Sequence, residues 1–167
     1  MDEYLTREDF LKRAGQITLG AIATGGLVVA PSMAEVEWAK AEATRVTQNG
    51  KRIMREARKW LGTPYKHNGR SRHGIDCSMF VKRVYGASLG VYVPDDPVAI
   101  WRNGARRRGE VCVGDILCYK ENHNYISHVA IQCYGGDVIH ASAYWGKVVK
   151  APRTWRGCNL QGAAVWR

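Results

Sequence analysis

The spacing of apolar residues changes after Gly109, and this change limits the folds open to the chain. Before Gly109, apolar residues recur at helical spacing. This pattern predicts a helix over residues 51–61, a second over 77–89 and a short third over 96–101. Gly90 fits the position just beyond the end of the second helix. The first half of the domain is therefore expected to be helical.

After Gly109 the apolar residues gather in short β-prone runs bounded by turn residues. These runs cover residues 116–119, 128–133, 138–141, 147–150 and 163–166. Gly135-Gly136 between the second and third runs is a hairpin signal. Helices followed by neighbouring strands predict an α+β domain, with N-terminal helices packed on a C-terminal antiparallel β-sheet.

Residues 1–34 have the character of an export signal. A charged start leads into an apolar run over 17–30, and Ser32-Met33-Ala34 fits a small-x-small cleavage site. The run is too short for a comfortable bilayer span. Residues 6–12 resemble a twin-arginine signal in which Glu8 replaces the second arginine. We expect a secreted or wall-associated protein; an ordinary N-terminal helix or an uncleaved membrane anchor is the alternative.

A leader or linker is expected over residues 35–50, helical in composition and broken at Gln48-Asn49-Gly50. Residues 51–167 then form the domain, which is long enough for one compact core and too short for two. We therefore expect no second domain within these residues.

The chain is strongly basic, with a net charge of +10. Residues 35–167 hold 22 basic and 11 acidic residues, a net charge of +11, so the charge belongs to the folded part. An anionic partner would explain it: nucleic acid, an acidic membrane or an anionic cell-wall polymer. A well-solvated basic surface without a specific partner explains it equally. No nucleic-acid-binding motif accompanies the charge, so we expect no nucleic acid.

Five cysteines occur, at positions 77, 112, 118, 133 and 158. None belongs to a CxxC pair, so a zinc site is not expected. In an exported protein, one free thiol and up to two disulfides would account for the odd number. If all remain reduced, Cys112, Cys118 and Cys133 would be small buried hydrophobic residues.

Cys77, His128 and His140 form a candidate catalytic set. Cys77 begins a predicted helix, where backbone N–H groups and the helix dipole are expected to lower the thiol pKa. A hairpin at 135–136 would place His128 and His140 on one sheet face, as general base and as the group that orients it. The alternatives are a core cysteine and two histidines that are satisfied by ordinary hydrogen bonds.

Five motifs in order resemble the NlpC-type cell-wall peptidases, which are papain-like cysteine peptidases of bacteria. The motifs are Trp60-Leu61-Gly62-Thr63-Pro64-Tyr65, Asp76-Cys77-Ser78, Gly114-Asp115, His128-Val129 and Ile139-His140-Ala141. The resemblance runs from residue 51 to residue 149. Two departures are Met79, where the family usually has glycine, and Ala130, where glycine is common.

The resemblance implies hydrolysis of peptidoglycan stem peptides between γ-D-glutamate and a diamino acid, without a metal or cofactor. By position, Cys77 is the nucleophile, His128 the general base and His140 its orienting partner. The resemblance also places Tyr65 near the oxyanion. Asp76 and Ser78 match positions that hold the N-terminal amine of the stem peptide. The structural alternatives are that Tyr65 packs under a loop and that Asp76 and Ser78 cap a helix.

Three other functions stay open at this point. An N-acetylmuramoyl-L-alanine amidase could use a similar Cys-His fold, and a non-catalytic cell-wall-binding protein could keep the fold without the reaction. A basic nucleic-acid-binding protein is the third. We expect a monomer whose partners are stem peptides and, through its charge, anionic wall polymers.

Overall fold

A computed structural model of the protein describes residues 32–107, 110–155 and 158–166. The predicted export signal lies outside these ranges except for its last three residues. None of the described helices is long and apolar enough to cross a lipid bilayer.

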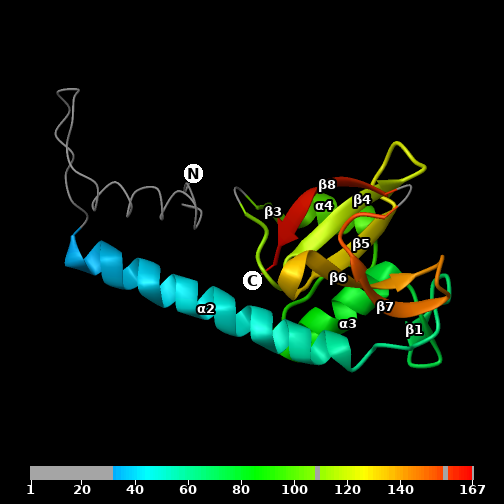
Figure 1. Ribbon diagram of the computed structural model, residues 1–167, viewed down its shortest axis with the longest axis horizontal. Coiled ribbons are helices and arrows are strands. Elements are labelled where there is room, and N and C mark those ends of the chain that lie inside the picture. Colours follow the sequence, from blue (N-terminus) through cyan, green and yellow to red (C-terminus); the bar gives the residue numbers. More distant parts are fainter. Residues whose placement is uncertain (1–31, 108–109, 156–157, 167) are drawn as a thin grey trace.

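The first described helix, α2, is one unbroken helix over Met33–Arg58. It runs through Gln48-Asn49-Gly50, so the predicted break there is wrong. Gly50 is buried, and a Cβ at this position would lie 2.6 Å from the carbonyl oxygen of Val113. The glycine therefore permits close packing of α2 on a neighbouring segment, and this packing outweighs its low helix propensity. The N-terminal half of α2 extends away from the sheet (Figure 1).

The other two helices follow the sequence closely. Helix α3 spans Cys77–Leu89, as predicted, and Gly90 ends it in a left-handed conformation with φ of 70°. Helix α4 spans Pro97–Asn103 and ends two residues beyond the prediction. Asp96 caps α4, because its side chain accepts a hydrogen bond of 2.7 Å from the backbone N–H of Ala99.

Six antiparallel strands form the main sheet in the order β3-β8-β4-β5-β6-β7 (Figure 1). Their bounds are Ala105–Arg106 for β3, Ile116–Glu121 for β4, His128–Gln132 for β5, Asp137–Ser142 for β6, Lys147–Pro152 for β7 and Cys158–Val165 for β8. All five predicted runs are confirmed as strands, although β8 begins five residues earlier than predicted. Sequence analysis missed β3 and a two-stranded ribbon of β1 (Arg70–Ser71) and β2 (Gly74–Ile75), which lies between α2 and α3. The α+β prediction is confirmed.

Both faces of the sheet are buried, and alternate residues of β4 serve alternate faces. Ile116 and Cys118 join the core that α2 and α3 share with the sheet. Leu117 and Tyr119 join a smaller cluster with Trp155 on the other face. Because side chains alternate between the two faces along a strand, only residues that point to the same face can contact one another.

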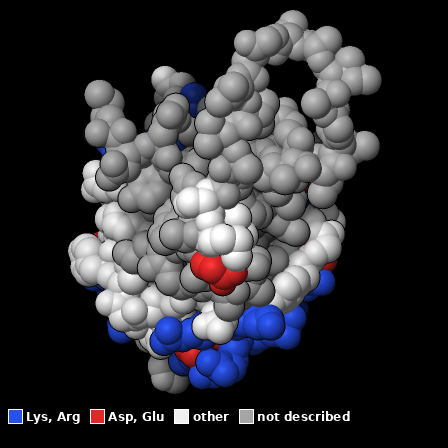
Figure 2. Space-filling view, turned by 90° about the vertical axis from the view of Figure 1, so that its left-hand side faces the viewer, with Lys and Arg blue, Asp and Glu red and all other residues white. Residues whose placement is uncertain are grey.

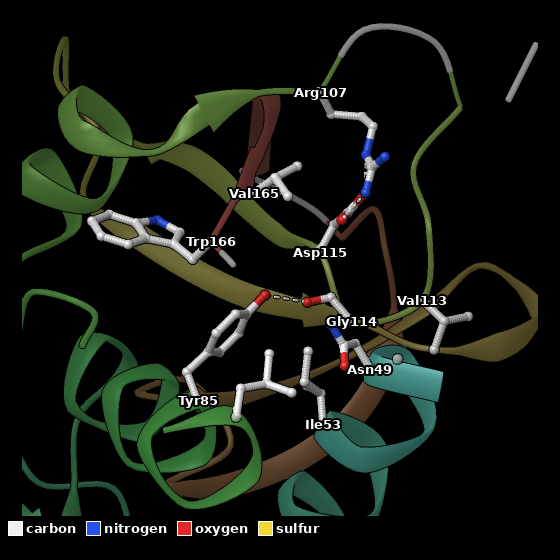
Figure 3. A pocket seen from close by; sticks show the side chains of 11 residues that line it. Asn49, Ile53, Tyr85, Arg107, Val113, Gly114, Asp115, Val165 and Trp166 are labelled. Atoms are coloured by element: carbon white, nitrogen blue, oxygen red, sulfur yellow. Dashed lines mark hydrogen bonds and ion pairs between the residues drawn. The ribbon is translucent and has the colours of Figure 1, made fainter. Parts of the chain in front are cut away.

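A cavity of about 30 Å³ lies between α2, α3 and the start of β4 (Figure 3). The Tyr85 hydroxyl donates a hydrogen bond to the carbonyl oxygen of Gly114 at its edge. Nearby, the Arg107 guanidinium forms a bidentate ion pair with the Asp115 carboxylate. The cavity has room for about one water molecule. It lies at the opposite end of β4 from Glu121, so it supports the fold rather than the candidate site.

Candidate active site

Cys77 is the first residue of α3. Asp76 caps the helix: its Oδ1 accepts a hydrogen bond of 2.7 Å from the Met79 backbone N–H. The thiol is buried, with 7% of Cys77 exposed, and the backbone N–H groups of Val129 and Ser78 donate toward the sulfur. The Cys77 sulfur is therefore held between the N-terminal end of α3 and the start of β5.

Burial raises the pKa of the Cys77 thiol to about 12. The carboxylates of Asp76 and Glu121 act in the same direction, while the two backbone N–H groups oppose it. The predicted lowering of this pKa at a helix N-terminus is therefore wrong, because loss of hydration outweighs the favourable backbone dipoles. At neutral pH the resting side chain is a thiol.

The side chains of His128 and His140 lie close together, as predicted from the hairpin between their strands. Strands β5 and β6 are antiparallel, with Ile131 opposite Ile139. The rings of the two histidines stand nearly perpendicular, and His128 Nε2 lies 2.7 Å from His140 Nδ1. Both side chains are buried. Between the described residues, no hydrogen bond joins the Cys77 thiol to either ring, which is common before a substrate binds.

Both histidines are neutral at neutral pH. Burial lowers the pKa of His128 well below its ordinary value, and the neighbouring His140 lowers it further. Burial also lowers the pKa of His140, to about 4. The hydrogen bond between them is therefore one between neutral rings, in which one ring donates and the other accepts. His140 Nε2 is buried and has no hydrogen-bond partner among the described residues.

Trp155 and Glu121 complete the site, and sequence analysis missed both. The Trp155 ring stacks on His140 at 4.9 Å and turns its edge toward His128 at 5.8 Å. Its indole Nε1 donates a hydrogen bond of 3.1 Å to Glu121 Oε1. The other carboxylate oxygen, Oε2, lies 3.8 Å from His128 Nδ1. Glu121 follows Tyr119 at the strand period on β4, and that period could have placed it on the face of Trp155.

Tyr65 lies near the thiol. Its backbone N–H donates to the carbonyl oxygen of Gly146 at 2.8 Å, which joins its loop to the turn between β6 and β7. Partial burial raises the pKa of the Tyr65 hydroxyl, and the charges at Cys77, Asp76 and Glu121 raise it further. The four groups thus share one electrostatic environment.

Asp76 has the capping role that was the alternative to substrate binding, whereas the Ser78 hydroxyl forms hydrogen bonds within the domain. Ser78 is 3% exposed, and its hydroxyl donates to the carbonyl oxygen of Asp95 at 2.8 Å. Ser78 Oγ also lies 3.0 Å from Asp76 Oδ1. Asp76 Oδ2 has no hydrogen-bond partner among the described residues. Of the side-chain oxygens of Asp76 and Ser78, this one is therefore available to a ligand.

None of the five cysteines forms a disulfide with another described residue. Cys118 and Cys133 are buried, as expected for reduced cysteines, whereas Cys112 is only half-buried. Among the described residues, no group of three or more histidine, cysteine or acidic side chains could hold a metal ion.

Basic side chains gather along one edge of the molecule (Figure 2). Lys51, Arg52, Arg55 and Arg58 are exposed on the C-terminal half of α2. A surface groove of about 590 Å³ lies between this part of α2 and α3 and is lined by Arg70, Lys82, Arg83 and Tyr92, among others. This groove is a separate surface from the histidine pair.

Comparison with known proteins gives consistent matches. A model of the NlpC/P60 family matches residues 62–156. The chain is 31% identical over 93 residues to a Bacillus subtilis protein named gamma-DL-glutamyl hydrolase, covering 54% of this chain. It spans only 22% of that protein, and less than two thirds of the other curated relatives it matches.

Two solved structures are similar in fold. The NlpC/p60 domain of the peptidoglycan hydrolase SagA matches with 30% identity and a TM-score of 0.60, over 70% of this chain and 97% of that one. RipD of Mycobacterium tuberculosis, described as a non-catalytic NlpC/p60 domain protein adapted to peptidoglycan binding, matches with 15% identity and a TM-score of 0.60. It covers 71% of this chain and 97% of the other.

Proposed function

The chain belongs to the NlpC/P60 family, and we propose that it is an exported cysteine peptidase that hydrolyses peptidoglycan stem peptides at the γ-D-glutamyl–diamino acid bond. The observation that carries this proposal is the His128–His140 pair, held at 2.7 Å, together with the backbone N–H of Val129, next to His128 in the chain, which donates toward the Cys77 sulfur. Two similar proteins, a gamma-DL-glutamyl hydrolase and a peptidoglycan hydrolase, support the bond and the substrate class.

The two nitrogens of His128 have different roles in this mechanism. Nε2 is occupied by His140, so Nδ1 is the nitrogen that can accept the thiol proton. For Nδ1 to be free, the ring proton must lie on Nε2 and be donated to His140 Nδ1. His140 then carries its own proton on Nε2. By accepting this hydrogen bond, His140 fixes the tautomer and the orientation of the base.

Acylation starts from neutral groups. The Cys77 sulfur attacks the γ-carbonyl carbon of D-glutamate while its proton passes to His128 Nδ1. The carbonyl electron pair moves to the oxygen, and backbone N–H groups at the start of α3 stabilise the resulting oxyanion. Because burial disfavours both thiolate and imidazolium, proton transfer accompanies attack rather than preceding it.

Breakdown of the tetrahedral intermediate gives a thioester. The imidazolium of His128 donates its Nδ1 proton to the leaving amine of the diamino acid as the C–N bond breaks. Water then attacks the thioester, with His128 as base, and releases the γ-carboxylate of D-glutamate and the free Cys77 thiol. Apart from the substrate and water, each step uses only side chains and backbone groups of this chain.

The basic surface supplies a second part of the proposal. Muramyl carboxylates and wall phosphates are anionic, and the charges on α2 and around the groove would attract them. Wall binding should therefore weaken as salt is added. Binding that is independent of salt would contradict this role.

The test uses the tripeptide L-alanyl-γ-D-glutamyl-diamino acid, with the product identified by mass spectrometry. We expect the native protein to release free diamino acid, Cys77→Ala to release none, and Cys112→Ala, at a thiol remote from the histidines, to act like the native protein. Cleavage of a muramoyl-L-alanine substrate instead would indicate the amidase. Binding of peptidoglycan without any cleavage would indicate a non-catalytic role like that described for RipD.

A further inference from the structure

The Glu121 carboxylate stands beside the catalytic base and is fixed in place. Its residue ends β4, where the Glu121 backbone N–H donates to Ser127 Oγ at 2.8 Å, next to His128 in the chain. One side-chain oxygen is held by the indole of Trp155. A third of the Glu121 side chain is exposed. The carboxylate is thus held in position and still partly exposed to solvent.

Within the described part of the chain, this carboxylate has no lysine or arginine partner; burial raises its pKa, and the neighbouring His123 acts in the opposite direction. His128 Nδ1, at 3.8 Å from Oε2, lies beyond hydrogen-bond distance and is neutral. Among the described residues, no lysine or arginine forms an ion pair with Glu121. Several other carboxylates of the domain form ion pairs with lysine or arginine, such as Asp115 with Arg107 and Asp137 with Lys150 at 2.7 Å. Glu121 is thus a carboxylate beside the histidine pair that no described lysine or arginine neutralises, so a cationic ligand could bind there.

The position of Glu121 identifies which part of the substrate it faces. In the proposed reaction, His128 Nδ1 donates a proton to the amine that leaves, so the leaving diamino acid lies next to Nδ1. Glu121 Oε2 is on this side of the base. The diamino acid has a second amine at the end of its side chain. In an uncrosslinked stem peptide this amine is a free ammonium, whereas in a crosslink it is a neutral amide.

We propose that Glu121 binds the free side-chain ammonium of the leaving diamino acid and so directs the protein to uncrosslinked stem peptides. This inference rests on the proposed peptidase function and adds the choice of substrate within it. Trp155 acts as a positioning residue, because its indole N–H aims the carboxylate. A charge-assisted hydrogen bond would form with the ammonium, and an acylated amine would leave the half-buried carboxylate unsatisfied.

The experiment compares two tripeptides that differ only in acetylation of the side-chain amine of the diamino acid. We expect the native protein to prefer the free amine by about tenfold in kcat/KM, equivalent to ~1.4 kcal/mol. Glu121→Gln should bring this ratio to within about twofold of one. Glu110→Gln, which removes an exposed carboxylate before the start of β4, should keep the native ratio.

Trp155→Phe provides a second variant, because it keeps an aromatic ring against His140 but removes the indole N–H. Its preference for the free amine in kcat/KM should lie between that of the native protein and that of Glu121→Gln. Equal cleavage of both tripeptides by the native protein would overturn the proposal. So would a Glu121→Gln variant that loses the same factor on both, because Glu121 would then act on the charge of His128. If the native protein cleaves neither tripeptide, the proposed function itself fails.

Discussion

Burial of His140 makes folding stability depend on pH in a window set by its pKa. The pKa is about 4 in the folded protein and 6.5 for an ordinary histidine. The unfolded chain therefore binds more protons than the folded one between these values, and stability falls as the pH is lowered through the window. A difference of one pKa unit corresponds to about 1.4 kcal/mol, so the full loss below pH 4 is about 3 kcal/mol.

The loss of folding stability at an experimentally accessible pH follows from the same two pKa values. At pH 5, histidine at its ordinary pKa is almost fully protonated, whereas His140 in the folded protein is almost fully neutral. The expected loss between pH 7.5 and pH 5 is about 2 kcal/mol from this residue. His128, whose pKa is also lowered, adds to the loss in the same direction.

Urea unfolding at pH 7.5, 6 and 5 measures this loss. The native protein should lose about 2 kcal/mol more than His140→Gln, whose side chain is similar in size and does not titrate. His67→Gln, at an exposed histidine, serves as the control and should follow the native curve. Parallel curves for the native protein and His140→Gln would refute the reasoning, because they would mean that His140 does not titrate differently on folding.

Three further predictions follow from burial and close packing. Gly50→Ala should destabilise the fold by about 2 kcal/mol, because its Cβ would meet the backbone of Val113. Gly86→Ala should instead stabilise α3 by about 0.5–1 kcal/mol, because no atom lies within 4 Å of the added Cβ. Urea unfolding that ranks the two variants the other way would contradict this packing. Tyr85→Phe should cost about 1–2 kcal/mol by the same assay, since it leaves the Gly114 carbonyl without its donor, and an unchanged midpoint would argue against that bond. Iodoacetamide should alkylate Cys77 more slowly at pH 7 than it alkylates free cysteine, with a rate still rising at pH 10, because the thiol pKa is about 12; a plateau near pH 7 would show a thiolate instead.

Much of the fold could be predicted from local signals in the sequence. The bounds of α3 followed from helical spacing that begins at Cys77 and ends before Gly90, and the hairpin that joins the histidines followed from Gly135-Gly136. These features depend on residues near one another in the chain. The prediction of a helix break at Gly50 was wrong because this glycine packs against Val113, 63 positions away in the chain. Local helix propensity cannot reveal such a contact.

The sequence pointed to candidate reacting groups but not to their surroundings. Cys77, His128 and His140 were predicted as these groups because thiol chemistry needs those residue types. Glu121 and Trp155 lie on β4 and before β8, and they meet only because these strands are neighbours in the sheet. The pKa of Cys77 was misjudged for a related reason. Its burial depends on β5 as well as on α3, whereas the sequence showed only the helix end.

Digestion of purified peptidoglycan by the native protein and by Cys77→Ala, with fragments identified by mass spectrometry, tests the central claim most directly. The proposed mechanism predicts new fragments that end in γ-D-glutamate from the native protein and none from the variant. Such fragments from both proteins would remove Cys77 from the reaction. No fragments from either, with the protein folded and reduced, would contradict peptidase activity altogether.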